Sequence, residues 1–158
     1  MTSQSFTTTI SVDRTAEEVF NAVTDVRGWW SRAVEGGTER SGDEFVFTVP
    51  GIHRSEMRLT EVVPNKKVVW LAVDNRLEFV EDKTEWNGTE IHFDISEKNG
   101  KTELRFTHIG LVPEFECFDA CSTGWSFYIN ESLRDLITTG TGQPSEFPDE
   151  VALRRAAQ

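Results

Sequence analysis

The two cysteines of the chain, Cys117 and Cys121, are four residues apart, and this spacing raises the question of a redox or metal site. On a helix, residues four apart share a face with Cβ atoms about 5–6 Å apart, whereas a disulfide needs about 3.5–4.5 Å. A structural zinc site needs about four ligands, and the histidines, His53, His92 and His108, are scattered along the sequence. We therefore predict no metal site and interpret both cysteines as small buried side chains on a helix. The redox question stays open if Cys117 precedes that helix.

His108 is the histidine whose position suggests a place in a site. In the stretch "ELRFTHI", Leu104, Phe106 and His108 alternate onto one face of a predicted strand, so His108 continues an inward apolar row. It could present a polar group to a cavity there. The alternative is a histidine that is hydrogen-bonded in the core or beside the turn at Gly110. The same counting places His92 on the outer face of its strand.

Arrangements typical of catalysis are sparse. Ser31, Ser55 and Ser122 lack a G-x-S-x-G context, and we assign them no histidine nearby in the sequence. There is no glycine-rich phosphate loop. We predict no catalytic residues and no cofactor, which favours a binding protein and leaves the enzyme question open.

Hydrophobic alternation predicts the elements that must position these side chains. Residues 5–12 alternate as a half-buried strand, and residues 13–26 form a short amphipathic helix with Thr15 as its N-cap. We expect Pro113 to open one long helix that ends near Gly140. The predicted strands between these helices occupy residues 44–50, 54–63, 66–73, 76–80, 89–97 and 102–109, the last two joined by an Asn-Gly hairpin turn.

Strands linked by hairpins, with helices segregated from them, are typical of an α+β domain built on an antiparallel sheet. The long helix carries an apolar stripe that includes Cys121, Trp125 and Ile129, and the concave face of the sheet is the surface available to bury it. We expect one domain over residues 1–144 and a polar tail over residues 145–158.

The charge and composition limit the kinds of partner. The formal net charge is −11, which disfavours nucleic acid and anionic membranes as partners. No apolar run approaches the roughly 20 residues of a membrane span, and the N-terminal residues do not resemble a signal peptide. With two cysteines in the chain, a reducing cytoplasm is the simplest expected location.

Four stretches of the chain resemble a known family: "DRTAEEVFNAVTDVRGWWS", "LTEVVPNKKVVW", "TELRFTHIGL" and "GWSFYINESLRDLITTGTGQP". They are similar, in the right order, to the family named for the activator of the heat-shock-protein-90 ATPase, in the START-like (SRPBCC) superfamily. This resemblance implies the helix-grip fold, a curved antiparallel sheet of about six to seven strands around a long C-terminal helix, with a short helix pair after the first strand. It also implies a cavity between sheet and helix. Related superfamily members bind sterols, lipids, polyketides or plant hormones, and some catalyse cyclisation, so the fold does not select the function.

We therefore predict non-catalytic binding of a small hydrophobic or amphipathic ligand between the sheet and the long helix, with Trp29 and Trp30 closing the cavity mouth. One alternative is a protein-interaction or co-chaperone-like module that acts through its surface and contacts a chaperone. Another is an enzyme that uses the cavity for cyclisation or hydrolysis, with His108 and a carboxylate as acid and base. A monomer and a homodimer are both compatible with the sequence. The residues predicted to line the ligand site are Trp30, Phe47, Met57, Trp70, Phe93, Phe106, His108, Cys121, Trp125 and Ile129.

Overall fold

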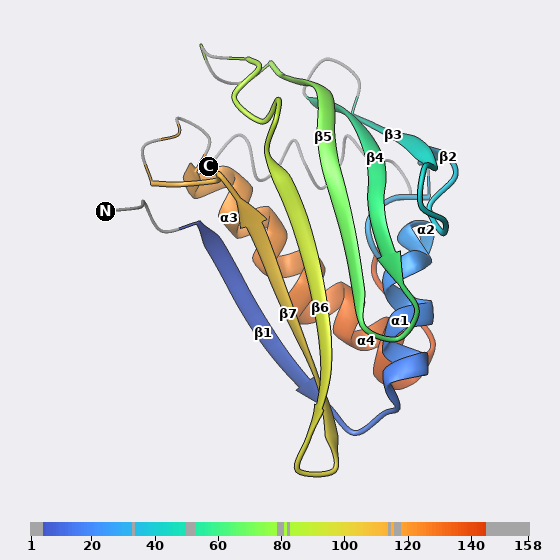
Figure 1. Cartoon of the computed structure of the whole chain (residues 1–158). Coiled ribbons are helices and arrows are strands. Elements are labelled where there is room, and N and C mark those ends of the chain that lie inside the picture. The colour runs from blue at the N-terminus through green and yellow to red at the C-terminus, as the bar shows by residue number, and fades with distance from the viewer. Residues whose placement is uncertain are drawn as a thin grey trace.

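A seven-stranded antiparallel sheet, with strand order β1-β7-β6-β5-β4-β3-β2, forms the framework of the computed structural model (Figure 1). The structure describes residues 5–32, 34–49, 53–78, 81, 83–113, 115 and 118–144, so Cys117 and the predicted tail 145–158 lie outside the described residues. The strands are β1 (Phe6–Val12), β2 (Glu35–Gly36), β3 (Glu44–Val49), β4 (His53–Val63), β5 (Lys67–Leu77), β6 (Glu90–Lys98) and β7 (Lys101–Ile109). The predicted α+β class and antiparallel sheet are confirmed.

Helices cover the inner face of this sheet (Figure 1). The helix α1 (Ala16–Thr24) is followed by the short α2 (Val26–Trp29). The long C-terminal helix consists of α3 (Phe118–Phe127), a π-helical turn η1 (Tyr128–Leu133) and α4 (Arg134–Thr139). In Figure 1, α3 is the part of the long helix that lies nearer the upper end of the sheet.

The start of α1 follows the predicted capping pattern. The Thr15 hydroxyl accepts a hydrogen bond from the Glu18 backbone N–H at 3.1 Å, and the Glu18 carboxylate accepts one from the Thr15 N–H at 3.0 Å. This reciprocal pair satisfies two N–H groups that the first turn of a helix leaves unpaired. The Thr15 N–H also lowers the pKa of Glu18, because it stabilises the charged carboxylate.

The long helix begins later than Pro113, where we expected it to open. Pro113 lies in a turn, and the helix starts at Phe118. The reason is that the chain still belongs to the sheet just before this point. The Leu111 carbonyl accepts a hydrogen bond from the Phe6 N–H at 2.8 Å, and Leu111 is fully buried.

Strand β5 is one continuous strand rather than the two predicted at 66–73 and 76–80, of which Phe79 and Val80 lie outside the described residues. An irregularity in its pairing with β4 changes the phase of its inward side chains. Trp70 and Ala72 are buried, and the next buried residue is Asn75, three positions on. A bulge of this kind adds one residue to a strand and keeps a different set of side chains on the inner face.

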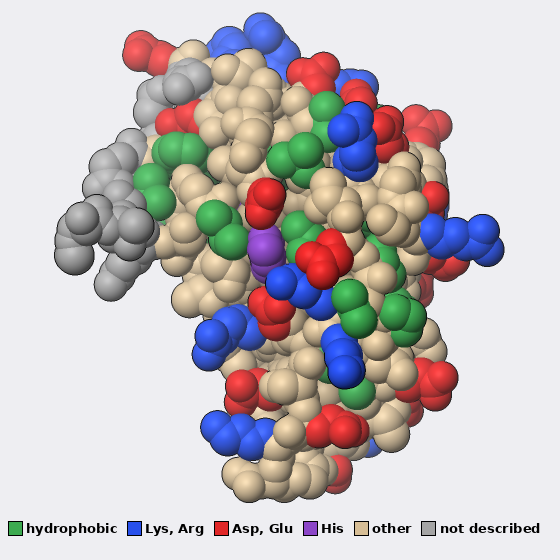
Figure 2. All heavy atoms as spheres, viewed as in Figure 1, with side chains coloured by type: hydrophobic (Ala, Val, Ile, Leu, Met, Phe, Trp, Pro, Cys, Tyr) green, Lys and Arg blue, Asp and Glu red, His purple; other side chains and the backbone are tan. Residues whose placement is uncertain are grey.

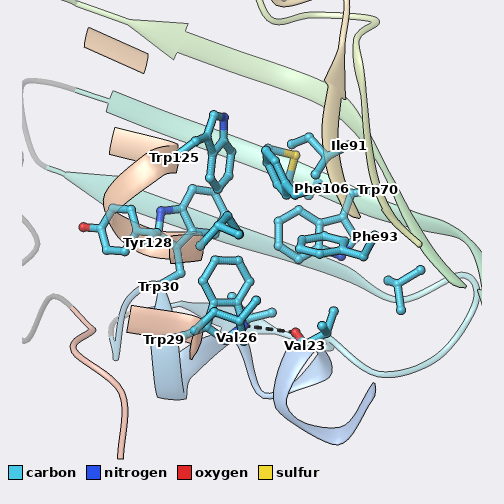
Figure 3. Packing of buried hydrophobic residues seen from close by; sticks show 14 of the residues in the cluster. Val23, Val26, Trp29, Trp30, Trp70, Ile91, Phe93, Phe106, Trp125 and Tyr128 are labelled. Atoms are coloured by element: carbon cyan, nitrogen blue, oxygen red, sulfur yellow. Dashed lines mark hydrogen bonds between the residues drawn. The ribbon is translucent and has the colours of Figure 1, made fainter. Parts of the chain in front are cut away.

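The core between sheet and helices is dominated by stacked aromatic rings (Figure 3). Trp29 stacks on Trp70 with ring centroids 6.1 Å apart, and Trp30 stacks on Phe47 at 4.2 Å. The prediction that Trp29 and Trp30 close a cavity mouth is wrong. Both are buried in the centre of the core, where the Trp29 indole N–H donates to the Val23 carbonyl at 3.1 Å.

The outer face of the sheet carries side chains of both charges (Figure 2). Ion pairs cross neighbouring strands there, such as Arg58 with Glu44 at 2.8 Å. His92 faces outward as predicted and contacts Glu90 at 2.9 Å, in a half-buried position rather than a fully solvated one. In the described part of the chain, no helix has the length and apolar character that a transmembrane span requires.

Candidate functional site

The structure brings all ten residues predicted to line a ligand site into one buried cluster. None of them is more than 9% exposed. Trp125 on α3 contacts aromatic rings on both sides of it, because its ring centroid lies 5.0 Å from that of Trp30 and 4.8 Å from that of Phe106. The aromatic wall of the sheet continues through Phe93, which lies 5.3 Å from Phe106 and 4.8 Å from Trp70. The lining role of these residues remains a prediction.

His108 is fixed by a chain of hydrogen bonds. The Trp125 indole N–H donates to His108 Nδ1 at 3.1 Å, so in the neutral ring the proton resides on Nε2. Nε2 lies 2.8 Å from Thr89 Oγ1, which in turn donates to the Trp86 carbonyl at 2.6 Å. Both ring nitrogens are therefore engaged. His108 has none left to orient a ligand, and it corresponds to the core histidine that we considered as the alternative.

A second inward-facing histidine, half-buried, lies next to a serine on β4. His53 Nε2 is 2.5 Å from Ser55 Oγ, because residues two apart on a strand point to the same face. The expectation that the serines have no histidine nearby in the sequence is therefore wrong for Ser55. The ring of His53 stands edge-on to Trp86 at 4.9 Å and to Phe47 at 5.3 Å.

Trp86 covers the inner face at this end of the sheet. It comes from the segment 83–89, which hydrogen-bonds alongside the end of β5 through Leu77 N–H to the Lys83 carbonyl and Gly88 N–H to the Ala72 carbonyl. Its ring is 4.7 Å from His108 and stacks on Trp125 at 5.9 Å, and the residue is 2% exposed. Trp86 thus joins the sheet to helix α3.

Asn75 is buried on β5 with an unpaired side chain. It sits opposite Ser55 in the β4–β5 register, and its backbone N–H donates to the Asn87 side-chain oxygen at 2.6 Å. Among the described residues, neither the oxygen nor the nitrogen of its carboxamide has a hydrogen-bond partner, and the residue is 1% exposed. The indole nitrogens of Trp86 and Trp70 are likewise buried and unpaired within that part of the chain.

Four residues on the inner face are linked to one another by these pairings and contacts. We name them the inner polar cluster: His53, Ser55, Asn75 and Trp86. Asn75 pairs with Ser55 across the strands, Ser55 contacts His53, and His53 contacts Trp86. Asn87, next to Trp86 in the sequence, returns to the Asn75 backbone. The cluster lies beside Trp125 and His108, at the end of the predicted lining that faces α3.

The inner polar cluster carries no charge near neutral pH. Burial lowers the pKa of His53 to about 3, although the residue as a whole is not fully buried. Burial also lowers the pKa of His108 to about 3, with a smaller contribution from His53. A base with such a low pKa is poorly matched to removing the Ser55 proton near pH 7, so the His53–Ser55 pair is better suited to binding than to nucleophilic catalysis.

The described residues form neither the acid–base pair with His108 nor the metal site that we considered. His108 has no carboxylate partner among the hydrogen bonds described above, which the acid–base alternative requires. Within the same residues, no group of three or more His, Cys, Asp or Glu side chains is placed to hold a metal ion.

A surface hollow of about 720 Å³ lies far from the predicted lining, where the β6–β7 hairpin meets the start of α1. Its walls mix basic and acidic side chains, including Arg14, Lys101 and Glu18, and it contains none of the ten predicted residues. Three basic and three acidic side chains line it, so it has no net charge to select a charged ligand.

Sequence reasoning missed Asn75 and Trp86, and it named His53 and Ser55 without recognising that they lie side by side. Asn75 was hidden by the bulge, because strict alternation from Trp70 places Asp74 and Arg76 inward instead. Trp86 lies in a polar segment between two predicted strands, and the signal available was the presence of one large apolar side chain in it. The signal for Ser55 was the H-x-S spacing on a predicted strand.

Comparisons with known proteins place this geometry in a family. The family model described as "Activator of Hsp90 ATPase homolog 1-like protein" matches residues 13–138. The solved structure of the Aha1 dimer from Colwellia psychrerythraea is 25% identical, with a TM-score of 0.71, covering 88% of this chain and 99% of that chain. No curated protein sequence matches.

Two further structures share the fold at lower identity. MLL2253 from Mesorhizobium loti is 14% identical with a TM-score of 0.65, covering 87% of this chain and 100% of that chain. CalU16 from Micromonospora echinospora, in its solution structure, is 17% identical with a TM-score of 0.65, covering 98% of this chain and 81% of that chain. At these identities the likeness shows the common architecture of sheet and long helix.

Proposed function

We propose that this chain, which belongs to the family of Activator of Hsp90 ATPase homolog 1-like proteins, binds a small, largely apolar ligand between its sheet and helix α3. The family fold supports a domain with a cavity in this place. The aromatic cluster supports the apolar character of the ligand, because rings such as Trp125 and Phe106 offer large flat surfaces to it. Ligand sites of this kind combine mainly apolar walls with a few polar groups.

The observation that carries the proposal is the unpaired carboxamide of Asn75. Leaving a buried polar group without a hydrogen bond costs about 1–3 kcal/mol, and buried amides in folded proteins nearly always have partners. Asn75 and the Trp86 indole N–H together present a buried acceptor and buried donors on the inner face. A bound ligand that reaches the inner polar cluster would satisfy them.

The arrangement supports binding without catalysis. The His108 ring nitrogens are occupied by Trp125 and Thr89, and His53 is a weak base. Neither histidine is placed to cycle a proton at neutral pH.

A neutral fluorescent probe and the indole N–H signals test this proposal together. We expect 1-aminoanthracene to gain fluorescence on addition of the protein, and the Trp70 and Trp86 indole signals in a ¹H–¹⁵N spectrum to shift. The Trp29 indole, which is bonded to Val23, serves as an internal reference and should not move. Unchanged probe fluorescence together with unchanged indole signals at saturating probe would refute internal binding.

Two helix variants separate internal binding from adhesion to the surface. Cys121→Leu adds volume on the inward side of α3, and we expect it to weaken probe binding about tenfold or more. Thr123→Leu adds a similar apolar group at an exposed position two residues away and should leave binding unchanged. Equal effects of the two variants would contradict a site beneath α3.

Failure of internal binding would favour the surface-acting alternative, an interaction or co-chaperone-like module. The Colwellia psychrerythraea structure is that of a dimer, so we also propose that this chain forms a homodimer. Light scattering of the purified chain tests this, with a mass of twice 17.9 kDa expected and the single-chain mass contradicting it.

A further inference from the structure

We propose that the inner polar cluster selects ligands carrying a neutral group that both donates and accepts hydrogen bonds, of the carboxamide or lactam class. This inference rests on the proposed function, because it names what the polar end of that site recognises. It concerns Asn75 and Trp86, whose unpaired polar atoms lie on the same side of the sheet as the aromatic lining.

The unpaired atoms define the hydrogen-bonding pattern of the partner. The Asn75 carboxamide requires a donor for its oxygen and an acceptor for its nitrogen, and the Trp86 indole adds a further donor. Exchanging the oxygen and nitrogen of Asn75 leaves this conclusion unchanged, because both atoms lack a partner among the described residues. A carboxamide or lactam pairs with another carboxamide through one N–H donor and one carbonyl acceptor.

Other polar groups in and beside the cluster already have hydrogen-bond partners. The Ser55 hydroxyl is held by His53 at 2.5 Å, and the nitrogens of His108 are bonded to Trp125 and Thr89. Asn75 and Trp86 are therefore the members whose buried side-chain nitrogen and oxygen atoms have no partner among the described residues. Ser55 on β4 is the residue directly opposite Asn75 in the β4–β5 register.

Charge excludes the common ionic alternatives. Next to Asn75 on β5, Asp74 and Arg76 are exposed. Arg54, which is opposite Arg76 on β4, reaches Asp74 at 3.8 Å on the outer face. The inward side chains of β4 and β5 thus bring no carboxylate, ammonium or guanidinium to the cluster in the described residues, and both histidines are neutral. A carboxylate or ammonium ligand would be buried there without a counter-charge, which is strongly unfavourable.

Three probes with one ring system and different head groups test the inference. We would measure the binding of 2-naphthamide, 2-naphthoate and 2-methylnaphthalene to the full chain by calorimetry at pH 7. We expect 2-naphthamide to bind at least about tenfold more tightly than either of the others, which corresponds to about 1.4 kcal/mol. We also expect it to shift the Trp86 indole signal further than 2-methylnaphthalene does.

Variants at the two unpaired groups assign the preference to the cluster. Asn75→Leu keeps a similar shape and removes both polar atoms. We therefore expect this variant to bind 2-naphthamide and 2-methylnaphthalene about equally. Trp86→Phe retains an aromatic ring but removes the N–H, and should reduce the preference about threefold or more. Asn21→Leu, at an exposed position on α1, is the matched control and should retain the full preference.

Each result supports or overturns a defined part of the inference. Equal binding of all three probes would overturn head-group selection while leaving the proposed internal site intact. Tighter binding of 2-naphthoate would overturn the requirement for a neutral ligand. An unchanged preference in both Asn75→Leu and Trp86→Phe would overturn the assignment to the inner polar cluster. Binding of none of the probes, together with a failed 1-aminoanthracene test, would overturn the proposed function as well.

Discussion

At the scale of single residues, His108 illustrates what alternation along a strand can and cannot predict. Counting from Leu104 and Phe106 placed it on the inner face, where it is fully buried. Its partners could not be predicted, because Thr89 and Trp125 are distant in sequence and meet it only in the folded chain. The sequence therefore predicts the side of the sheet, and tertiary contacts determine the chemistry of the ring.

The two inward-facing histidines, the buried His108 and the half-buried His53, make stability depend on pH. Each has a pKa of about 3 in the folded chain and 6.5 as its ordinary value, so between these values the unfolded chain binds more protons. The free energy of unfolding should be unaffected by these groups above about pH 6.5 and fall as the pH drops toward 3. Each histidine contributes on the order of 1 kcal/mol per pH unit in that window. Urea unfolding at a series of pH values between 7.5 and 4.5 measures the slope.

Two glutamine variants identify the residues responsible for this slope. His108→Gln removes one of the two titrating rings and should flatten the decline to about half, at the cost of lower stability at neutral pH. His92→Gln removes the outward-facing ring and should keep the full decline. A slope in His108→Gln as steep as in the unaltered chain would contradict the role of the buried ring.

At the scale of elements, the β5 bulge marks the limit of pattern reasoning. The positions of β1, β3, β4, β6 and β7 followed from alternation and hairpin turns, including the turn at Asn99 and Gly100, both with positive φ, whereas β5 was predicted as two strands. The bulge between Ala72 and Asn75 did not, because it depends on the pairing with β4 and has no distinct composition. One inserted residue was enough to exclude Asn75 from the predicted lining.

The end of the long helix is held by a contact that also required the structure. The Ser132 hydroxyl donates to the Trp29 carbonyl at 2.7 Å and accepts from the Gln143 N–H at 2.8 Å. These bonds fold the chain after Gly140 back against α2. Gly142 packs there so closely that a Cβ atom would lie 2.3 Å from the Gly28 carbonyl oxygen. The stretch "TTGTGQP" is thus both a helix stop and a packing surface.

Two glycine substitutions should have opposite effects on the free energy of unfolding. Gly142→Ala forces a backbone contact apart, and we expect a loss of about 1–3 kcal/mol. Gly124→Ala lies inside α3, where a Cβ meets no atom within 4 Å, and should gain about 0.5–1 kcal/mol from helix propensity. Chemical denaturation of both variants measures this. A loss in Gly124→Ala would indicate that the space beside Gly124 is needed by the native chain.

At the scale of the whole molecule, an aromatic core is enclosed by an acidic surface. The architecture could be predicted almost fully, because the order of strands and helices and the family resemblance agree with the observed sheet and long helix. The polar part of the candidate site could be predicted least, since it is assembled from β4, β5 and the segment 83–89. Residues close in space but separated in sequence give no local pattern.

The acidic surface predicts that salt stabilises the folded chain. A net charge of −11 produces repulsion that is greatest in the compact state, and the exposed ion pairs between strands offset little of it. Raising NaCl from about 20 mM to about 300 mM shortens the Debye length and should raise the free energy of unfolding by about 1 kcal/mol. Thermal and urea unfolding at both salt concentrations measure the change.

Charge variants distinguish this electrostatic effect from a general effect of salt on hydrophobic burial. Each Glu→Lys substitution adds two charges, so replacing the exposed Glu35 and Glu61 changes the net charge from −11 to −7. We expect this double variant to gain stability at low salt and to respond less to added NaCl. Lys66→Glu changes the net charge to −13 and should respond more strongly. If all three proteins gain the same free energy from salt, the increase arises from stronger hydrophobic burial, and surface repulsion does not limit the stability of the fold.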